Sequence, residues 1–96
     1  MTVNSEIIND SIKHYGVDAQ STVCMEECAE LIQAISKEKR GKHDHKHLSE
    51  EIADVLICIS MLQDMYEINS SDIQLWINLK QKRIVERMKQ DESHNK

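Results

Sequence analysis

The sequence predicts an all-α protein, and three observations support this fold class. The 96 residues include no proline and only two glycines, the residues that most often interrupt helices. Aromatic residues make up only 3% of the chain, so the side chains that favour β-sandwiches and barrels are scarce. Apolar residues recur three and four positions apart, which is the spacing of one helix face. We expect a single four-helix, bundle-like domain over residues 1–90 and a polar, frayed tail over residues 91–96.

The first two helices are expected at residues 4–14 and 18–40. Each is followed by a glycine, Gly16 or Gly41, which readily takes the left-handed conformation that ends a helix. The apolar residues that define their faces are Val3, Ile7, Ile8 and Ile12 for the first, and Val23, Cys24, Cys28, Leu31, Ile32 and Ile35 for the second.

The third helix is expected to start near Leu48 or Ser49 and to end near Glu67, with Ser49 as a plausible N-terminal cap. A short turn at residues 69–72 then leads into a fourth helix at residues 72–89. Because short connections favour antiparallel packing of neighbouring helices, this layout predicts a helical bundle.

The charge, cysteine content and length of the chain limit its partners. The formal net charge of −5 argues against binding to nucleic acid polymers or acidic membranes, which need a basic surface. No apolar run approaches bilayer length, and the first residues lack the features of a signal peptide. The odd number of cysteines, three, indicates reduced thiols in a cytoplasmic protein. A chain this short is often marginal alone, so we expect a homodimer or homotetramer.

Two acidic pairs lie against the apolar stripes of the second and third helices. On a helical wheel, Glu27 and Glu51 each fall within about 40° of apolar neighbours. Glu30 and Asp54 each lie about 60° to the side of the first acid in the pair. The apolar neighbours are Val23, Leu31 and Ala34 around Glu27, and Val55, Cys58, Leu62 and Met65 around Glu51.

Carboxylates that face a core need a compensating partner. An unpaired buried carboxylate is costly, and four that converge repel one another. A divalent cation resolves this conflict, and ligand sets made only of carboxylates favour Mg²⁺, or Mn²⁺, over Zn²⁺. The alternative is that these are ordinary surface acids, since charged residues make up 30% of the chain.

The fourth helix carries an indole and three cations on one face. Lys80, Arg83 and Arg87 all fall within about 40° of Trp76 on the wheel. This face could contact the base and phosphates of a nucleotide, because arginine binds phosphate in bidentate fashion. Alternatively, the cations pair with acids of other helices or lie in solvent, and Trp76 belongs to the core.

Two other groups of residues suggest metal chemistry more weakly. Three histidines alternate in the polar segment 42–47, and alternate residues of an extended loop can converge on a transition metal. We interpret this segment as a solvated loop instead; its histidines are His43, His45 and His47. Three thiols could bind zinc, but we interpret them as small core side chains; they are Cys24, Cys28 and Cys58.

The order of these motifs resembles that of MazG-like nucleoside triphosphate pyrophosphohydrolases, of the all-α NTP pyrophosphatase superfamily. That family is marked by an E-x-x-E box and an E-x-x-D box separated by a loop. Here the boxes are Glu27-x-x-Glu30 and Glu51-x-x-Asp54. The preceding Tyr15-Gly16 and Gln20 also match, and the similarity extends from residue 5 to residue 88.

The resemblance implies an all-α enzyme that hydrolyses the bond between the α- and β-phosphates of a nucleoside triphosphate, releasing a monophosphate and pyrophosphate. It implies that the four boxed acids bind Mg²⁺ and that the enzyme is a dimer or tetramer with its site at or near a subunit interface. A metal-activated water would attack the α-phosphorus, with Glu30, or else Glu26, taking its proton.

The last helix supplies the substrate contacts that the resemblance implies. Lys80 and Arg87 match a Lys and an Arg of many relatives. Many relatives have Asn between them, where Arg83 is nearest here, so the preferred base and sugar are not implied. The main alternative function is a non-catalytic helical dimerisation or adaptor module, which has no need for inward acids. A second alternative is a protein whose metal only stabilises the bundle.

Overall fold

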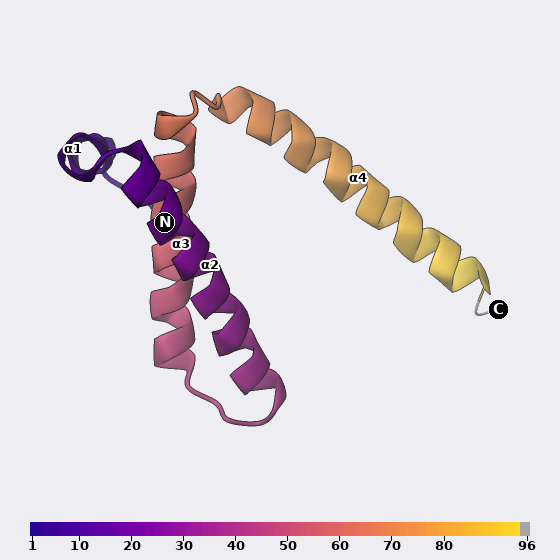
Figure 1. Ribbon diagram of the computed structural model, residues 1–96. Helices are drawn as coiled ribbons and strands as arrows, with labels where there is room; N and C mark the ends of the chain where they lie inside the picture. Colours follow the sequence, from indigo (N-terminus) through magenta and orange to yellow (C-terminus); the bar gives the residue numbers. More distant parts are fainter. Residues whose placement is uncertain (95–96) are drawn as a thin grey trace.

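The computed structural model describes residues 1–94, which form four helices and no strand. The predicted all-α fold class is therefore confirmed for this part of the chain. None of the helices is both long and apolar enough to cross a bilayer. The helices, shown in Figure 1, are α1 (Ser5–Tyr15), α2 (Val17–Lys39), α3 (His45–Met65) and α4 (Ser70–His94).

A single glycine joins α1 to α2. Gly16 has φ 93° and ψ 159°, a conformation that only glycine adopts readily. Its N–H donates to the carbonyl of Ile12 at 2.8 Å, and its own carbonyl accepts from the N–H of Gln20 at 3.1 Å. The chain therefore ends one helix and starts the next without a loop, and α1 packs against both α2 and α3.

The helices α2 and α3 form an antiparallel hairpin, side by side in Figure 1, which is the main packed unit of the chain. Its core is small: Cys24, Cys58 and Met61 are buried together with Ile8 of α1. The Cys24 thiol lies 3.7 Å from the carbonyl oxygen of Cys58, within the distance of a weak S–H hydrogen bond. The core therefore unites all three of the packed helices.

Only two of the three cysteines predicted to lie in the core are buried in the structure. Cys24 and Cys58 are buried, as predicted, whereas Cys28 is exposed, so the core prediction was wrong for Cys28. Burial raises the pKa of the Cys58 thiol to about 12, and Cys24 adds to this rise. In the described part of the chain no cysteine belongs to a cluster of metal-binding side chains, so packing is the better interpretation of the buried pair.

The predicted start of α3 was wrong by one turn. Asp44 is the cap, since its side chain accepts from the N–H of His47 at 3.0 Å, and the helix starts at His45. The Ser49 hydroxyl instead donates to the carbonyl of His45 at 2.8 Å. The helix ends at Met65, before Glu67, whose φ of 53° is incompatible with a continuing helix.

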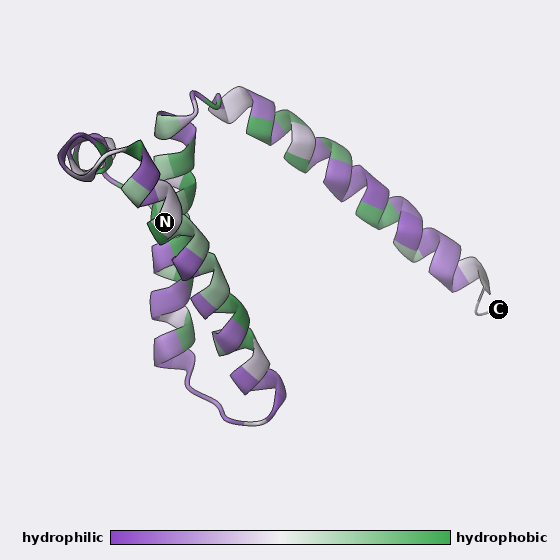
Figure 2. Cartoon of the chain, in the orientation of Figure 1, coloured by the Kyte–Doolittle hydropathy of each residue, from purple (hydrophilic) through white to green (hydrophobic). Residues whose placement is uncertain are grey.

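The expected bundle of four helices is not formed within one chain. Figure 1 shows α4 running away from the other three helices, and it has no extensive packing with them. Among its residues with described side chains, all except Ile73 are exposed. Figure 2 shows apolar and polar residues interspersed along α4. The sequence pattern indicated that α4 has apolar positions to cover, but it did not specify which surface covers them.

The polar tail also differs from its prediction. The helix α4 continues to His94, so residues 91–94, which we expected to be frayed, are helical. Residues 95 and 96 of the expected tail lie outside the described residues.

Candidate functional site

Three carboxylates converge where the middles of α2 and α3 meet. Glu27 extends from α2, and Glu51 and Asp54 extend from α3. Each side chain offers an oxygen within 4.8 Å of the oxygens of the other two. Glu51 is buried, with 6% of its surface exposed, while Glu27 and Asp54 are partly buried. We call Glu27, Glu51 and Asp54 the acidic centre.

Two oxygens of the acidic centre are buried without a hydrogen-bond partner. They are Oε2 of Glu27 and Oε2 of Glu51. A buried acceptor without a partner loses its hydration and gains nothing in return. The donor set is made only of carboxylates, the ligands of a hard divalent cation. The residues therefore fit a site for such an ion, because an ion would satisfy both oxygens and offset the negative charge.

The acids of this site raise one another's pKa. The pKa of Glu27 rises from 4.5 to about 7, mainly through burial, then through hydrogen bonding with Asp54 and the charges of Asp54, Glu30 and Glu51. The pKa of Glu51 is also raised, by burial and by the charge of Glu30, although His47 partly opposes the rise. Without a cation, these carboxylates are therefore hard to ionise together.

The remaining predicted acids lie at the edge of the centre or outside it. Glu30 is exposed and is not one of the three converging residues, yet its charge raises the pKa of both Glu27 and Glu51. Glu30 therefore lies at the rim of the acidic centre. Glu26 is exposed on α2 and is not among the main causes of the raised pKa of Glu27 or of Glu51.

The predicted substrate-binding residues of α4 do not meet the acidic centre within one chain. Trp76, Lys80, Arg83 and Arg87 are all exposed on α4, which extends away from α2 and α3 (Figure 1). The Lys80 ammonium lies 6.0 Å from the centroid of the Trp76 ring, so these two side chains share a face. In the described part of the chain, none of the three cations forms an ion pair.

Sequence reasoning missed one residue beside the centre. His47 Nε2 lies 3.7 Å from Glu51 Oε1, one turn away on α3. The predicted start of α3, near Leu48 or Ser49, leaves His47 in the preceding loop, whereas the helix starts at His45. Recognising Asp44 as the cap would have put His47 and Glu51 on one face of the same helix at spacing i, i+4.

Residues 17–90 match the family model described as the MazG nucleotide pyrophosphohydrolase domain. The chain belongs to the MazG family. The match covers all of α2 and α3 and most of α4, so it includes both acidic boxes and the cations of α4. No curated protein and no solved structure matches the chain. The MazG assignment supports nucleotide pyrophosphohydrolase activity as a class, and the acidic centre is compatible with metal binding.

We predict that the metal-free MazG domain loses stability as the pH rises from about 5 to about 7. The pKa of Glu27 is about 7 in the folded state against an ordinary 4.5, so in this window the folded state binds more protons than the unfolded state. The free energy of unfolding then falls with rising pH. The total loss is at most about 3 kcal/mol, and solvent around the partly exposed carboxylate reduces it.

Urea unfolding in the presence of a chelator measures this loss. Glu27→Gln should flatten the pH profile and exceed the wild type in stability above pH 7, whereas Glu26→Gln should keep the wild-type profile. Parallel profiles for wild type and Glu27→Gln would contradict the burial of a titrating Glu27.

We predict that Glu51→Gln weakens Mn²⁺ binding at least about tenfold, since it neutralises the most buried carboxylate of the centre. Electron paramagnetic resonance of free Mn²⁺ measures the affinity. The matched control is Glu50→Gln, which makes the same charge change at the adjacent, exposed position of α3. Equal affinity in the wild type and both variants would remove Glu51 from the metal site.

Proposed function

We propose that this MazG domain hydrolyses nucleoside triphosphates to a monophosphate and pyrophosphate, with Mg²⁺, or alternatively Mn²⁺, held by Glu27, Glu51 and Asp54 and by Glu30 at the rim. One observation carries this proposal: Glu27 of α2 and Glu51 of α3 belong to one cluster of carboxylates, and each has a buried oxygen without a hydrogen-bond partner. Their unfavourable burial in the free chain is explained if a cation and its polyphosphate ligand complete the site.

The chemistry divides between the ion and the side chains. When bound, the ion supplies Lewis-acid polarisation of phosphoryl oxygens and lowers the pKa of water. Glu30 is the favoured general base, because it lies at the rim, where it is accessible to water and close to the buried carboxylates. Glu26, one turn away on α2 and also exposed, is the second candidate.

The positive charge that this reaction needs has to come from α4. Lys80, Arg83 and Arg87 offset charge on the leaving pyrophosphate if they reach the substrate. Within one chain α4 stands away from the acidic centre, so we propose that a second copy of the chain supplies these side chains. The proposed assembly is a homodimer or homotetramer.

The distribution of apolar surface supports this assembly. Large apolar side chains remain exposed on α4 and on the outward faces of α2 and α3 in a single chain. Association between copies would remove them from water and contribute stability that the small core lacks. Among those exposed are Ile32, Ile35, Ile52, Ile59, Leu75, Ile84 and Met88.

The alternative function, an adaptor module, explains fewer of the structural observations than the enzyme does. A non-catalytic dimerisation module would also expose apolar helix faces, but burial of Glu27 and Glu51 would only destabilise it. No specific observation favours it over the enzyme.

We predict that hydrolysis in ¹⁸O-labelled water places the label in the nucleoside monophosphate, because attack at the α-phosphorus leaves pyrophosphate as the unlabelled product. Mass spectrometry of both products measures the label. Label in the pyrophosphate would move the attack to the β-phosphorus. Release of orthophosphate and a diphosphate would contradict the proposed reaction. A panel of ribo- and deoxyribonucleotides in the same assay would identify the preferred base and sugar.

We predict that two impaired variants, Arg87→Ala and Glu51→Gln, complement each other. Arg87→Ala should lower kcat/KM at least about tenfold, the cost of one charged hydrogen bond. Lys82→Ala, which removes a cation on another face of α4, should change it little. If a partner subunit supplies Arg87, a mixed dimer of Arg87→Ala and Glu51→Gln contains one site in which both residues are intact. After random exchange of subunits about half of the dimers are mixed, so we expect about a quarter of the wild-type activity. Activity no higher than the mean of the two variants, or a monomer by light scattering, would contradict the shared site.

A further inference from the structure

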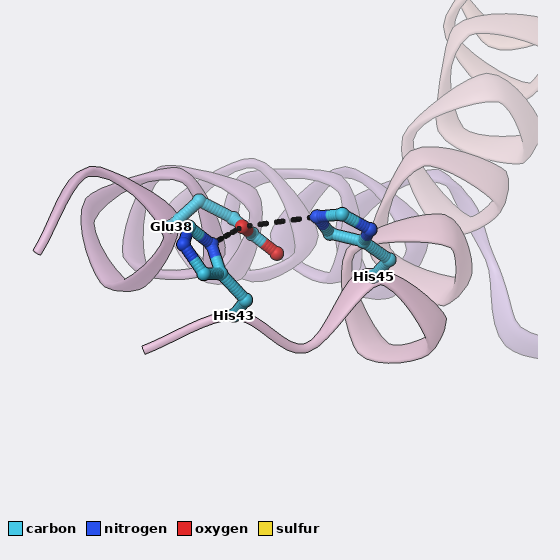
Figure 3. A group of neighbouring side chains, drawn as sticks. All are labelled: Glu38, His43 and His45. Carbon is cyan, nitrogen blue, oxygen red and sulfur yellow. Dashed lines mark hydrogen bonds and ion pairs between the residues drawn. The ribbon is translucent and has the colours of Figure 1, made fainter. Parts of the chain in front are cut away.

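A second cluster of metal-binding side chains lies where α2 turns into α3. It consists of Glu38 from the last turn of α2, His43 from the connecting loop and His45 from the start of α3. Figure 3 shows both imidazoles directed at the carboxylate of Glu38. Glu38 lies 11 residues, or about 16 Å of helix, from Glu27. The cluster is therefore separate from the acidic centre.

The backbone orients the Glu38 carboxylate toward the two imidazoles. Its Oε1 accepts from the N–H of Asp44 at 3.1 Å, which leaves Oε2 to face the rings. Oε2 lies 2.6 Å from His43 Nδ1 and 3.4 Å from His45 Nε2. One oxygen and two ring nitrogens thus lie within 4.8 Å of one another. The Glu38 side chain is only 17% exposed, so its position is well defined by its surroundings.

We propose that Glu38, His43 and His45 form a binding site for a transition-metal ion such as Zn²⁺. Two imidazoles and one carboxylate are a common ligand set for this class of ion, with a remaining position for water. The same set is unsuited to Mg²⁺, which prefers oxygen ligands. The ligand chemistry therefore distinguishes this site from the acidic centre, which contains no imidazole among its three converging residues.

The two distances from the Glu38 carboxylate to the imidazoles require only a small adjustment to accept the ion. Ligand atoms about 2.0 to 2.1 Å from a tetrahedral Zn²⁺ lie about 3.3 Å from one another. The Glu38–His45 distance of 3.4 Å already fits, and the Glu38–His43 distance of 2.6 Å would lengthen by less than an ångström. The His43 and His45 side chains are 65% and 81% exposed, so both rings can turn without disturbing the core.

An ion at this site would connect both ends of the α2–α3 turn. Glu38 belongs to α2 and His45 to α3, the two helices that carry the acidic boxes. Coordination would thus hold together the hairpin on which the acidic centre is built. The competing interpretation is a hydrogen bond between His43 and Glu38 that only stabilises the loop.

Titration of the full, untagged chain with Co²⁺, read by its visible absorption, and with Zn²⁺ in competition tests the proposal. Glu51→Gln serves as the background, since it weakens the acidic centre. In this background we expect one equivalent to bind with a spectrum that shows nitrogen ligation. His45→Asn should weaken this binding at least tenfold. The matched control, His14→Asn, removes an exposed histidine on α1 and should leave it unchanged.

Two outcomes would overturn the proposal. Absence of Co²⁺ and Zn²⁺ binding in the Glu51→Gln background would leave only the hydrogen bond between His43 and Glu38. Equal affinity in His45→Asn and the background, or an equal loss in His14→Asn, would indicate nonspecific binding to surface histidines. Nitrogen-15 spectra of the histidine rings give an independent readout: Zn²⁺ should shift His43 and His45 and leave His14 in place.

Discussion

The burial of carboxylates between two apolar helices is the constraint on which the rest of this structure depends. Glu27 and Glu51 occupy positions that in an ordinary hairpin would hold leucine or valine, and each keeps one buried oxygen without a partner. This arrangement costs stability in the free chain, since unpaired buried acceptors and neighbouring negative charges are both unfavourable. The surrounding packing has to hold the helices together despite that cost.

The packing holds α2 and α3 in one antiparallel register. Near the closed end Asp44 N–H contacts Glu38, and further along the Cys24 thiol meets the carbonyl of Cys58. At the far end the hydroxyls of Ser21 and Tyr66 lie 2.6 Å apart. The acidic centre lies between the first and second of these contacts, so its geometry follows from the register. A shift of one turn would separate Glu27 from its partners.

The constraint also accounts for the proposed role of α4. A site that gathers negative charge to bind a cation and a polyphosphate requires positive charge nearby, and among the described residues of α1–α3 only His47 lies beside the acidic centre as a group that can become positive. In the proposed assembly, the cations of α4 provide this charge because α4 lies against another copy of the hairpin, which would also cover its apolar residues. The same assembly would thereby bring positive charge to the proposed site and cover the apolar side chains that the single chain leaves exposed.

The local features of this fold could be predicted from the sequence, but its tertiary placements could not. Helical periodicity predicted the four helices and placed Glu27 and Glu51 on inward helix faces. Both of these predictions depend only on residues that are neighbours in the sequence. The start of α3 was missed because Asp44 and Ser49 are both acceptable caps, and only the structure shows Asp44 in use. The pairing of Glu38 with His43 and His45 depends on how the loop folds back. The position of α4 depends on surfaces outside its own sequence.

The most direct measurement is the anomalous diffraction of a crystal grown with Mn²⁺ and a non-hydrolysable nucleoside triphosphate. We expect an anomalous peak among the carboxylates of Glu27, Glu51 and Asp54, with the nucleotide phosphates completing the coordination shell. A nucleotide bound elsewhere, with no Mn²⁺ between α2 and α3, would contradict the assignment of the buried carboxylates as a metal centre.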